Sequence, residues 1–297
     1  MLSVVIPVYN YNCVQLVETL HKQLTASAVA FEIICLDDAS QIYVSENGVI
    51  ANLTHTTYKK SSINLGRTGT RQQLASTAKY DWLLFLDADV LPKSEVFIQT
   101  YLHTLTNDVD AIYGGFAYYE ETPESHHTLR WNYGRAKEQV SASTRNKAPY
   151  KIVISANFLI KKSLFLSINS EIGSKGYGYD NYFGAMLKAE RINVLHIDNE
   201  VFHLGLDTNA EYLRKKEQAA ETLVKLLASG NIVEHDNDLL RLFQKLKYFK
   251  LHYMFNFFHE CFALLIKKNL LGNHPKIPLL QFYRITYMCH FDLKNRL

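Results

Sequence analysis

The chain has 297 residues, of which 47% are hydrophobic and 21% are charged, and its formal net charge is +3. This composition excludes an intrinsically disordered chain and allows one large globular domain or a domain with an appendage. The four cysteines lie far apart with no Cys-x-x-Cys pair, so the sequence predicts neither a disulfide framework nor a structural zinc site.

The start of the chain and its longest apolar stretch bear on location. The first apolar segment, which begins at Leu2, lacks the charged leader and the cleavage site of a signal peptide. The stretch from 253 to 266 is interrupted by Asn256, His259 and Glu260, which argues against a membrane-spanning helix. Together with the isolated cysteines, these features predict a cytoplasmic location.

Apolar segments typical of buried strands alternate along the chain with amphipathic segments typical of helices. We expect strands at Leu2–Val8, Phe31–Leu36, Trp82–Leu86 and Ala111–Tyr113. We expect helices from Asn12 to Leu24 with a capping-box-like start, around Gly69–Ala78, from Pro92 to Leu105, and from Asn209 to Ser229. Solid apolar strands that alternate with helices predict an α/β fold, with a mostly parallel sheet covered by helices on both faces.

Polar residues follow three of the predicted strands, in the sequences PVYN, DDAS and DADV. Right-handed crossovers place the carboxyl ends of parallel strands at one edge of the sheet, where ligands of open α/β sheets bind. We therefore expect Asp37, Asp38, Asp87 and Asp89 to share one cleft.

The pattern Asp-x-Asp occurs three times, at 87/89, 108/110 and 236/238, but only the first ends a strongly apolar strand. We interpret the other two as loop or cap residues. Carboxylates gathered at a sheet edge repel one another unless a cation binds between them, and Mg²⁺ binds one or two carboxylates together with phosphate oxygens. Asp87 and Asp89 thus predict a metal and diphosphate site. The alternative, a helix N-cap at Asp89, leaves Asp87 unexplained.

Four segments resemble, in sequence and order, the motifs of the family 2 nucleotide-sugar glycosyltransferases, which have the GT-A fold: SVVIPVYN, EIICLDDAS, NLGRTGTRQQLASTAKYDWLLFLDADVLP and ISANFLIKKSLF. The resemblance covers roughly residues 2–205. It implies a Rossmann-like GT-A catalytic domain at 1–208, with a nucleotide-binding half at about 1–115 and an acceptor half at about 116–208. A helical, basic and aromatic region at 209–297 follows.

The resemblance also implies a donor site. Pro7 and Tyr9 would line the nucleotide pocket, and Asp38 would hold a uracil ring, which favours a UDP-sugar. Arg71, with Arg67 as a second candidate, would lie near the donor, where a cation suits the phosphates.

The metal and acceptor residues follow from the same resemblance. Asp87 and Asp89 would bind Mn²⁺ or Mg²⁺ and the sugar diphosphate. His203 resembles a histidine that approaches the metal or diphosphate in related transferases, with a structural histidine as the alternative.

Asp180 matches the catalytic base of the family, although Tyr179 stands where an acid is common; a turn residue is the alternative interpretation of Asp180. Asn157 matches a position next to the acceptor. The resemblance implies inverting transfer to a hydroxyl of a glycan or lipid-linked acceptor in polysaccharide or glycan biosynthesis, with no nucleic acid as a partner. A nucleotide-sugar-binding or scaffold protein without turnover remains an alternative. A nucleotidyltransferase or dinucleotide dehydrogenase is disfavoured, because no glycine-rich phosphate loop follows the first strand.

Two segments outside these motifs carry many charges. Pro123–Tyr150 is polar and basic, and we interpret it as a lid over the diphosphate or acceptor, with a solvated insertion as the alternative. From Arg241 to the end, ten Lys or Arg face two Asp or Glu, which gives +8, and aromatic residues are interleaved with lysines. We hypothesise that this region lies on the anionic inner face of a membrane; a packed helical subdomain or a dimer contact is the alternative.

Overall fold

The structure of the protein is a computed structural model that describes residues 1–106, 108–170, 172, 176–232 and 234–296. Its main sheet has the strand order β3-β2-β1-β4-β8-β6-β9 over the described residues. The strands are β1 (Leu2–Val8), β2 (Phe31–Asp37), β3 (Thr56–Lys60), β4 (Trp82–Leu86), β6 (Ala111–Tyr113), β8 (Asn157–Lys161) and β9 (Val194–His196). The first four run parallel and β8 runs antiparallel to β4 and β6, which confirms a mostly parallel α/β sheet.

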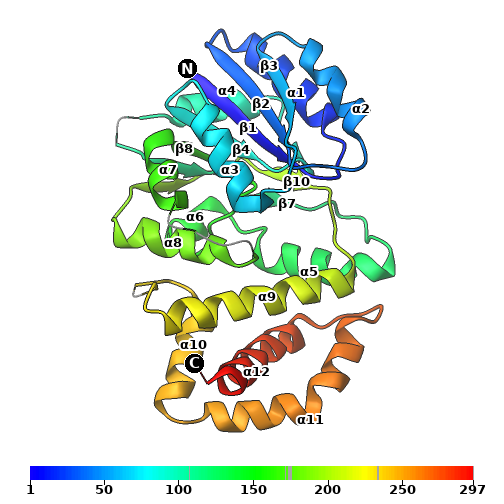
Figure 1. The fold of residues 1–297 in the computed structure, drawn as a ribbon, viewed down its shortest axis with the longest axis vertical. Helices are drawn as coiled ribbons and strands as arrows, with labels where there is room; N and C mark the ends of the chain where they lie inside the picture. The colour runs from blue at the N-terminus through cyan, green and yellow to red at the C-terminus, as the bar shows by residue number, and fades with distance from the viewer. Residues whose placement is uncertain (107, 171, 173–175, 233, 297) are drawn as a thin grey trace.

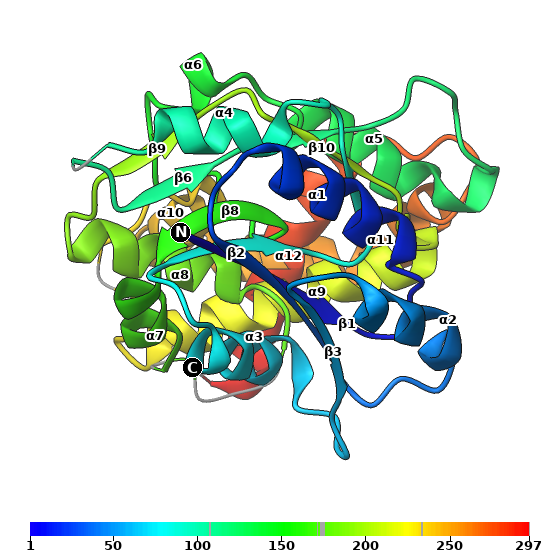
Figure 2. The same ribbon diagram turned by 90° about the horizontal axis from the view of Figure 1, so that it is seen from above.

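Helices cover both faces of this sheet, as Figure 2 shows from above. On one face lie α1 (Val14–Ala26) and α4 (Phe97–Thr104), and on the other lie α3 (Gly66–Thr77), α7 (Lys162–Ser170) and α8 (Tyr179–Ala189). Alternation along β1 explains the two cores, because Val4 and Ile6 pack with α1 and α4 while Val5 packs with α3 and α7. The predicted capping box of the first helix is wrong: Cys13 is the N-cap and makes no side-chain cap bond.

A second, small sheet has the order β5-β10-β7, formed by β5 (Val90–Pro92), β10 (Val201–His203) and β7 (Phe116–Ala117). The prediction that Pro92 begins a helix is therefore wrong. Pro92 ends an edge strand, where its missing N–H costs no ladder bond, and α4 begins only at Phe97. The segment between β2 and α3 also contains α2 (Val44–Gly48), a 3₁₀ helix (Val49–Asn52) and β3, none of which was predicted.

The predicted lid at 123–150 is a folded part of the domain. It contains a 3₁₀ helix (Ser125–His127), α5 (Thr128–Lys137) and α6 (Ala142–Arg145), and α5 lies beside α9 in Figure 1. Arg145 is wholly buried and donates hydrogen bonds to the carbonyl groups of Tyr113 and Ile197. Arg145 is therefore not part of a solvated insertion, because its buried guanidinium connects two segments of the fold.

The C-terminal region is helical, as predicted, and consists of α9 (Asn209–Ala228), α10 (Asp238–Tyr248), α11 (His252–Leu270) and α12 (Ile277–Asn295). A capping box between Thr208 and Glu211 begins α9 directly after the expected boundary at 208. Leu223 of α9, Phe243 of α10 and Met288 of α12 belong to the same core cluster as the sheet. The region is therefore a helical subdomain packed on the α/β domain, with α9 between the sheet and the last helices (Figure 1).

Candidate active site

The carboxyl ends of β1, β2 and β4 meet at one edge of the sheet, as predicted, because the three strands run parallel. A cavity of about 400 Å³ lies at this edge, and we call it the strand-end cavity. Every residue predicted to contact the donor lines it: Pro7, Tyr9, Asp38, Arg67, Arg71, Asp87 and Asp89.

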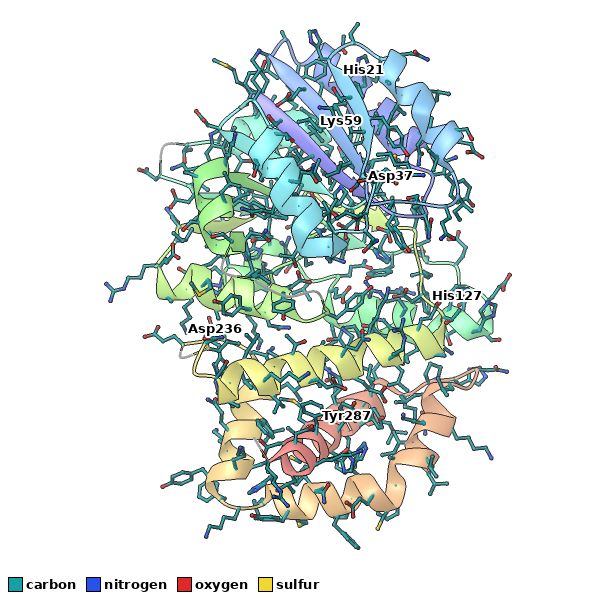
Figure 3. All side chains as sticks on the ribbon, in the orientation of Figure 1. His21, Asp37, Lys59, His127, Asp236 and Tyr287 are labelled. Carbon is teal, nitrogen blue, oxygen red and sulfur yellow. The ribbon has the colours of Figure 1, made fainter. Side chains whose placement is uncertain are left out.

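Asp37 does not line this cavity, so the expectation that four aspartates share one cleft is wrong for this residue. It is wholly buried at the end of β2 (Figure 3), where it accepts hydrogen bonds from the Tyr58 hydroxyl at 2.6 Å and the Ser40 backbone N–H at 2.7 Å. Successive residues of an extended chain point in opposite directions, so Asp37 and Asp38 do not face the same space.

Asp38 supports the segment that begins α3. Its two carboxylate oxygens accept hydrogen bonds from the backbone N–H groups of Leu65 at 2.6 Å and Gly66 at 2.9 Å. These bonds fix the floor of the strand-end cavity and place Arg67 and Arg71 on its wall. Tyr9, which is 56% exposed, stands at the mouth of the same cavity.

Asp87 is held between two arginines. Arg67 donates to one carboxylate oxygen at 3.1 Å and Arg71 donates to the other. Burial alone would raise the pKa of Asp87, but the positive charges of Arg67 and Arg71 outweigh it and lower the pKa below 3.8. Asp87 is therefore ionised and already neutralised by protein groups.

Among the described residues, no arginine forms an ion pair with Asp89. Burial, and then the negative charge of Asp87, raise its pKa from 3.8 to about 6. His203 lies beside Asp89, with Nε2 at 3.6 Å from Oδ2, because β10 pairs with β5 and sets His203 opposite Val90. A Cβ on Gly205 would clash with the Asp89 carboxylate, so a glycine is required there.

The chemistry of this pair fits a divalent cation. Burial, and then the charge of Arg130, lower the pKa of His203 to about 3, so the imidazole is neutral and able to bind a metal, and its buried Nδ1 has no hydrogen-bond partner. Within the described ranges no three His, Cys, Asp or Glu side chains gather as a complete metal site. Asp89 and His203 would therefore hold a cation only together with phosphate oxygens, as is usual for Mg²⁺.

A second cavity, of about 340 Å³, begins at Asp87, Asp89 and His203 and extends between α5, α8, α9 and α12; we call it the interhelical cavity. Asp180, in the first turn of α8, is exposed on its wall. Asp180, the predicted base, therefore lines the same cavity as the predicted metal ligands Asp89 and His203.

Gly178 fixes the start of α8 against α9. Its φ of 98° lies in the left-handed region, and a Cβ at this position would come within 2.9 Å of the Ala219 Cα. The neighbouring Tyr179 packs partly buried against the core and lines a small hollow next to Asp180. The position of Asp180 consequently depends on the contact between these two helices.

Asn157 lies outside both cavities, contrary to its predicted place beside the acceptor. It is wholly buried, and its amide donates to the carbonyl groups of Gly115 and Asn199, both at 2.9 Å, while its oxygen accepts from the Tyr101 hydroxyl at 2.7 Å. All its polar atoms are used inside the fold, so it holds β8 and the loops around it in place.

Sequence reasoning missed several residues of the interhelical cavity. Arg130 donates to Glu138 at 2.9 Å, and the Tyr118 hydroxyl donates to the same carboxylate at 2.7 Å. Lys216 of α9 and Arg284 of α12 complete the far wall. The basic character of 123–150 was the only signal for Arg130, and no local pattern linked α9 or α12 to the site.

Comparison with known proteins identifies the family. The sequence model described as glycosyl transferase family 2 matches residues 3–168, more than half of the chain. The chain belongs to this family. The match includes the strand-end motifs and ends before Asp180 and His203. A comparison of this chain with curated proteins finds no match.

Solved structures share the fold. The mannosyltransferase of Pyrobaculum calidifontis, solved with GDP-mannose and Mn²⁺, is 13% identical with a TM-score of 0.56, over 99% of this chain and 86% of that one. Mannosyl-3-phosphoglycerate synthase of Rubrobacter xylanophilus is 14% identical, with a TM-score of 0.53 over 80% and 77%. Glucosyl-3-phosphoglycerate synthase of Mycobacterium tuberculosis, solved with Mn²⁺, UDP and glucosyl-3-phosphoglycerate, is 12% identical, with a TM-score of 0.51 over 79% and 81%. The predicted GT-A fold and glycosyltransferase class are confirmed.

Proposed function

We propose that this family 2 enzyme transfers a sugar from a nucleotide-diphospho-sugar, with UDP favoured, to a hydroxyl of a glycan or lipid-linked acceptor, with inversion and with a divalent metal. The supporting observation is that Asp89 with His203 and the separate acid Asp180 line one cavity that opens from the nucleotide end of the sheet. Such an activity suits the biosynthesis of cell-surface polysaccharides or other glycans.

Each acid has a different task in this proposal. Arg67 and Arg71 neutralise Asp87 and so keep that carboxylate from repelling the diphosphate. Asp89 and His203 would hold Mn²⁺ or Mg²⁺, which when bound supplies positive charge that offsets the charge developing on the departing diphosphate. Asp180 accepts the proton of the acceptor hydroxyl as that oxygen attacks the anomeric carbon from the opposite face.

The test is a panel of UDP-, GDP- and dTDP-sugars with Mn²⁺ or Mg²⁺, scored by nucleotide release and by the anomeric configuration of the product. We expect release that depends on the metal, on an acceptor and on Asp180, with the anomeric configuration inverted. Binding of a nucleotide sugar with no turnover in any combination of acceptors would instead favour the binding or scaffold alternative. A product that retains the donor's configuration would contradict the role of Asp180.

We also propose that the enzyme meets an anionic membrane surface on the cytoplasmic side, near a lipid-linked acceptor. None of the described helices is long and apolar enough to cross a membrane. The support is an exposed apolar surface on α10 and α11, which we call the α10–α11 surface, with the exposed lysines 245, 250 and 268 around it. It is formed by Tyr248, Phe249, Tyr253, Phe257, Leu264 and Leu265.

Because α10 and α12 belong to the core, point variants rather than truncation test the membrane contact. We expect the double variant Leu264→Ser, Leu265→Ser to lose binding to vesicles that contain phosphatidylserine, while Val49→Ser, an exposed apolar control on another surface, retains it. Equal binding by the wild type and the double variant would refute the contact. A wild-type dimer that the double variant abolishes would assign the surface to a second copy of the chain.

A further inference from the structure

The far wall of the interhelical cavity has more positive charge than its acids balance. Four of the cations that line this cavity have a carboxylate partner: Arg67 with Asp87, Arg130 with Glu138, Lys151 with Asp238, and Lys215 with Asp207. Among the described residues, no carboxylate forms an ion pair with Lys216 or Arg284, and the lining Lys137, also unpaired, is exposed to solvent.

Lys216 and Arg284 are partly buried and come from two different helices, α9 and α12. The Nζ atom of Lys216 lies 4.2 Å from the ring centroid of Tyr133 and 4.8 Å from that of Tyr212. These rings stabilise the charge only partly, because a cation–π contact is weaker than a buried ion pair. Glu138 also attracts Lys216, but its ion pair is with Arg130, so among the described residues neither Lys216 nor Arg284 has a carboxylate partner of its own.

Two buried polar atoms around Lys216 and Arg284 also lack hydrogen-bond partners among the described residues. Arg284 Nη1 donates to Gln281 at 3.0 Å, but its Nε is buried without a hydrogen-bond partner, and so is the Tyr212 hydroxyl. Buried polar atoms of the described residues nearly always have partners, so two such atoms beside two unpaired cations indicate a ligand.

The titration of nearby groups agrees with a positive local potential. Burial, together with the charge of Arg284, lowers the pKa of Lys216 and outweighs the opposite effects of Tyr133 and Glu138. Burial would raise the pKa of Tyr133, but the charges of Lys216 and Arg284 outweigh it and lower that pKa. Both effects are relieved when an anion binds between the two cations.

The two cavities distinguish the donor from the acceptor. Arg67, Asp87, Asp89 and Lys215 line both cavities, whereas Lys216 and Arg284 line only the interhelical one. An anion bound by these two cations would lie on the far wall of the interhelical cavity, away from the residues that both cavities share. It belongs to a molecule that enters from the side of Asp180.

We propose that Lys216 and Arg284 bind a phosphate group of the acceptor, so that the acceptor hydroxyl reaches Asp180 on a phosphorylated molecule. Arginine presents a fork of donors that matches a phosphate, and the charge of a phosphate monoester at neutral pH balances the two cations. The proposal deepens the proposed function and rests on it, because it places the acceptor in the interhelical cavity. A soluble sugar phosphate and a lipid phosphate present the same group to this site, and the second titration below distinguishes them.

The closing experiment uses the full chain saturated with UDP and Mn²⁺, so that a phosphate probe does not occupy the diphosphate position. Inorganic phosphate is titrated calorimetrically into the wild type, Lys216→Gln, Arg284→Gln and the control Lys225→Gln, which alters an exposed lysine of α9 outside the cavity. We expect phosphate to bind the wild type and the control equally, and about tenfold more weakly to each of the other two variants. Affinity for UDP should be the same in all four proteins.

Equal phosphate affinity in all four proteins, or no binding by the wild type, overturns the proposal. Failure of every protein to bind UDP would instead contradict the proposed function, while phosphate binding lost in the two variants would still assign the anion site. A second titration compares a hexose phosphate with vesicles that carry a polyprenyl phosphate. Binding of either probe that depends on Lys216 and Arg284 supports the proposal and identifies the source of the phosphate, and binding of neither overturns it.

Discussion

Replacement of Asp89 by Asn has two opposite expected effects. It should stabilise the folded protein without metal, and it should weaken metal-dependent binding of the donor. The shift of its pKa from 3.8 to about 6 means that the ionised form is disfavoured in the folded protein. A shift of two pKa units corresponds to about 3 kcal/mol. Because 28% of the Asp89 side chain is exposed, solvent screens part of this effect, and we expect Asp89→Asn to stabilise the metal-free protein by about 1–2 kcal/mol at neutral pH.

The pH dependence has a definite sign. The folded pKa is raised, so the destabilisation is fully present above about pH 6 and is lost as the pH falls below 3.8, where Asp89 is protonated in both states. The stability difference between Asp89→Asn and the wild type should therefore shrink between pH 7 and pH 4. Chemical denaturation of both proteins across this range measures it.

The matched control is Asp110→Asn, the same change in another Asp-x-Asp pair. Asp110 forms an ion pair with Lys161 at 2.7 Å, and hydrogen bonds and the charge of that lysine lower its pKa although burial opposes them. This variant should be neutral or slightly destabilising, the opposite sign to Asp89→Asn.

Binding completes the test. Calorimetric titration of UDP and of uridine, with and without Mn²⁺, should show that Asp89→Asn loses the enhancement of UDP affinity by Mn²⁺, whereas uridine binding changes little. Asp110→Asn should bind both as the wild type does. If Mn²⁺ enhances UDP binding equally in Asp89→Asn and the wild type, Asp89 is not a metal ligand.

Three further substitutions test other parts of the structure. Asp180→Asn should lower the turnover rate by about 10²–10⁴-fold with unchanged affinity for UDP, measured by steady-state kinetics and calorimetry, and full activity would place the base elsewhere. Gly178→Ala should destabilise the protein by about 1–3 kcal/mol in chemical denaturation, since its φ is 98° and the new Cβ meets Ala219; an unchanged midpoint would refute the tight contact between α8 and α9. Arg145→Met should cost about 1–3 kcal/mol, because it removes the buried hydrogen bonds that Arg145 donates to the carbonyl groups of Tyr113 and Ile197, and a variant as stable as the wild type would contradict that role.

The sequence predicted the parts of the fold that have a strong local signal. The strands that begin at Leu2, Phe31 and Trp82 are continuous apolar segments, and the parallel connection between them placed Asp38, Asp87 and Asp89 at one edge. β3 escaped prediction because its sequence, TTYKK, is largely polar on an edge of the sheet. The small sheet was not predicted, because its strands have two or three residues, which is too few to show a hydrophobic periodicity.

The remaining parts of the candidate site depend on contacts between distant segments. No local pattern distinguishes the buried Asp37 from the neighbouring Asp38, because the hydrogen bond that binds Asp37 comes from Tyr58 on another strand. Lys216 and Arg284 become neighbours only when α9 and α12 pack together. The packing of α12 on α9 also includes a hydrogen bond between side chains. The hydroxyl of Tyr287, labelled in Figure 3, donates to Glu221 of α9 at 2.6 Å.

The packing of α12 into the common core has a consequence for how the protein is made. Chains are synthesised from the amino end, and the strand-end cavity draws its walls almost entirely from residues before Ala88 and Asp89. The interhelical cavity requires Arg284 of α12, which follows Asp89 by nearly two hundred residues. Most lining residues of the nucleotide pocket are therefore synthesised long before the last wall of the second cavity. Chains that end before α12 would lack both the wall that it provides and part of the core that stabilises the sheet.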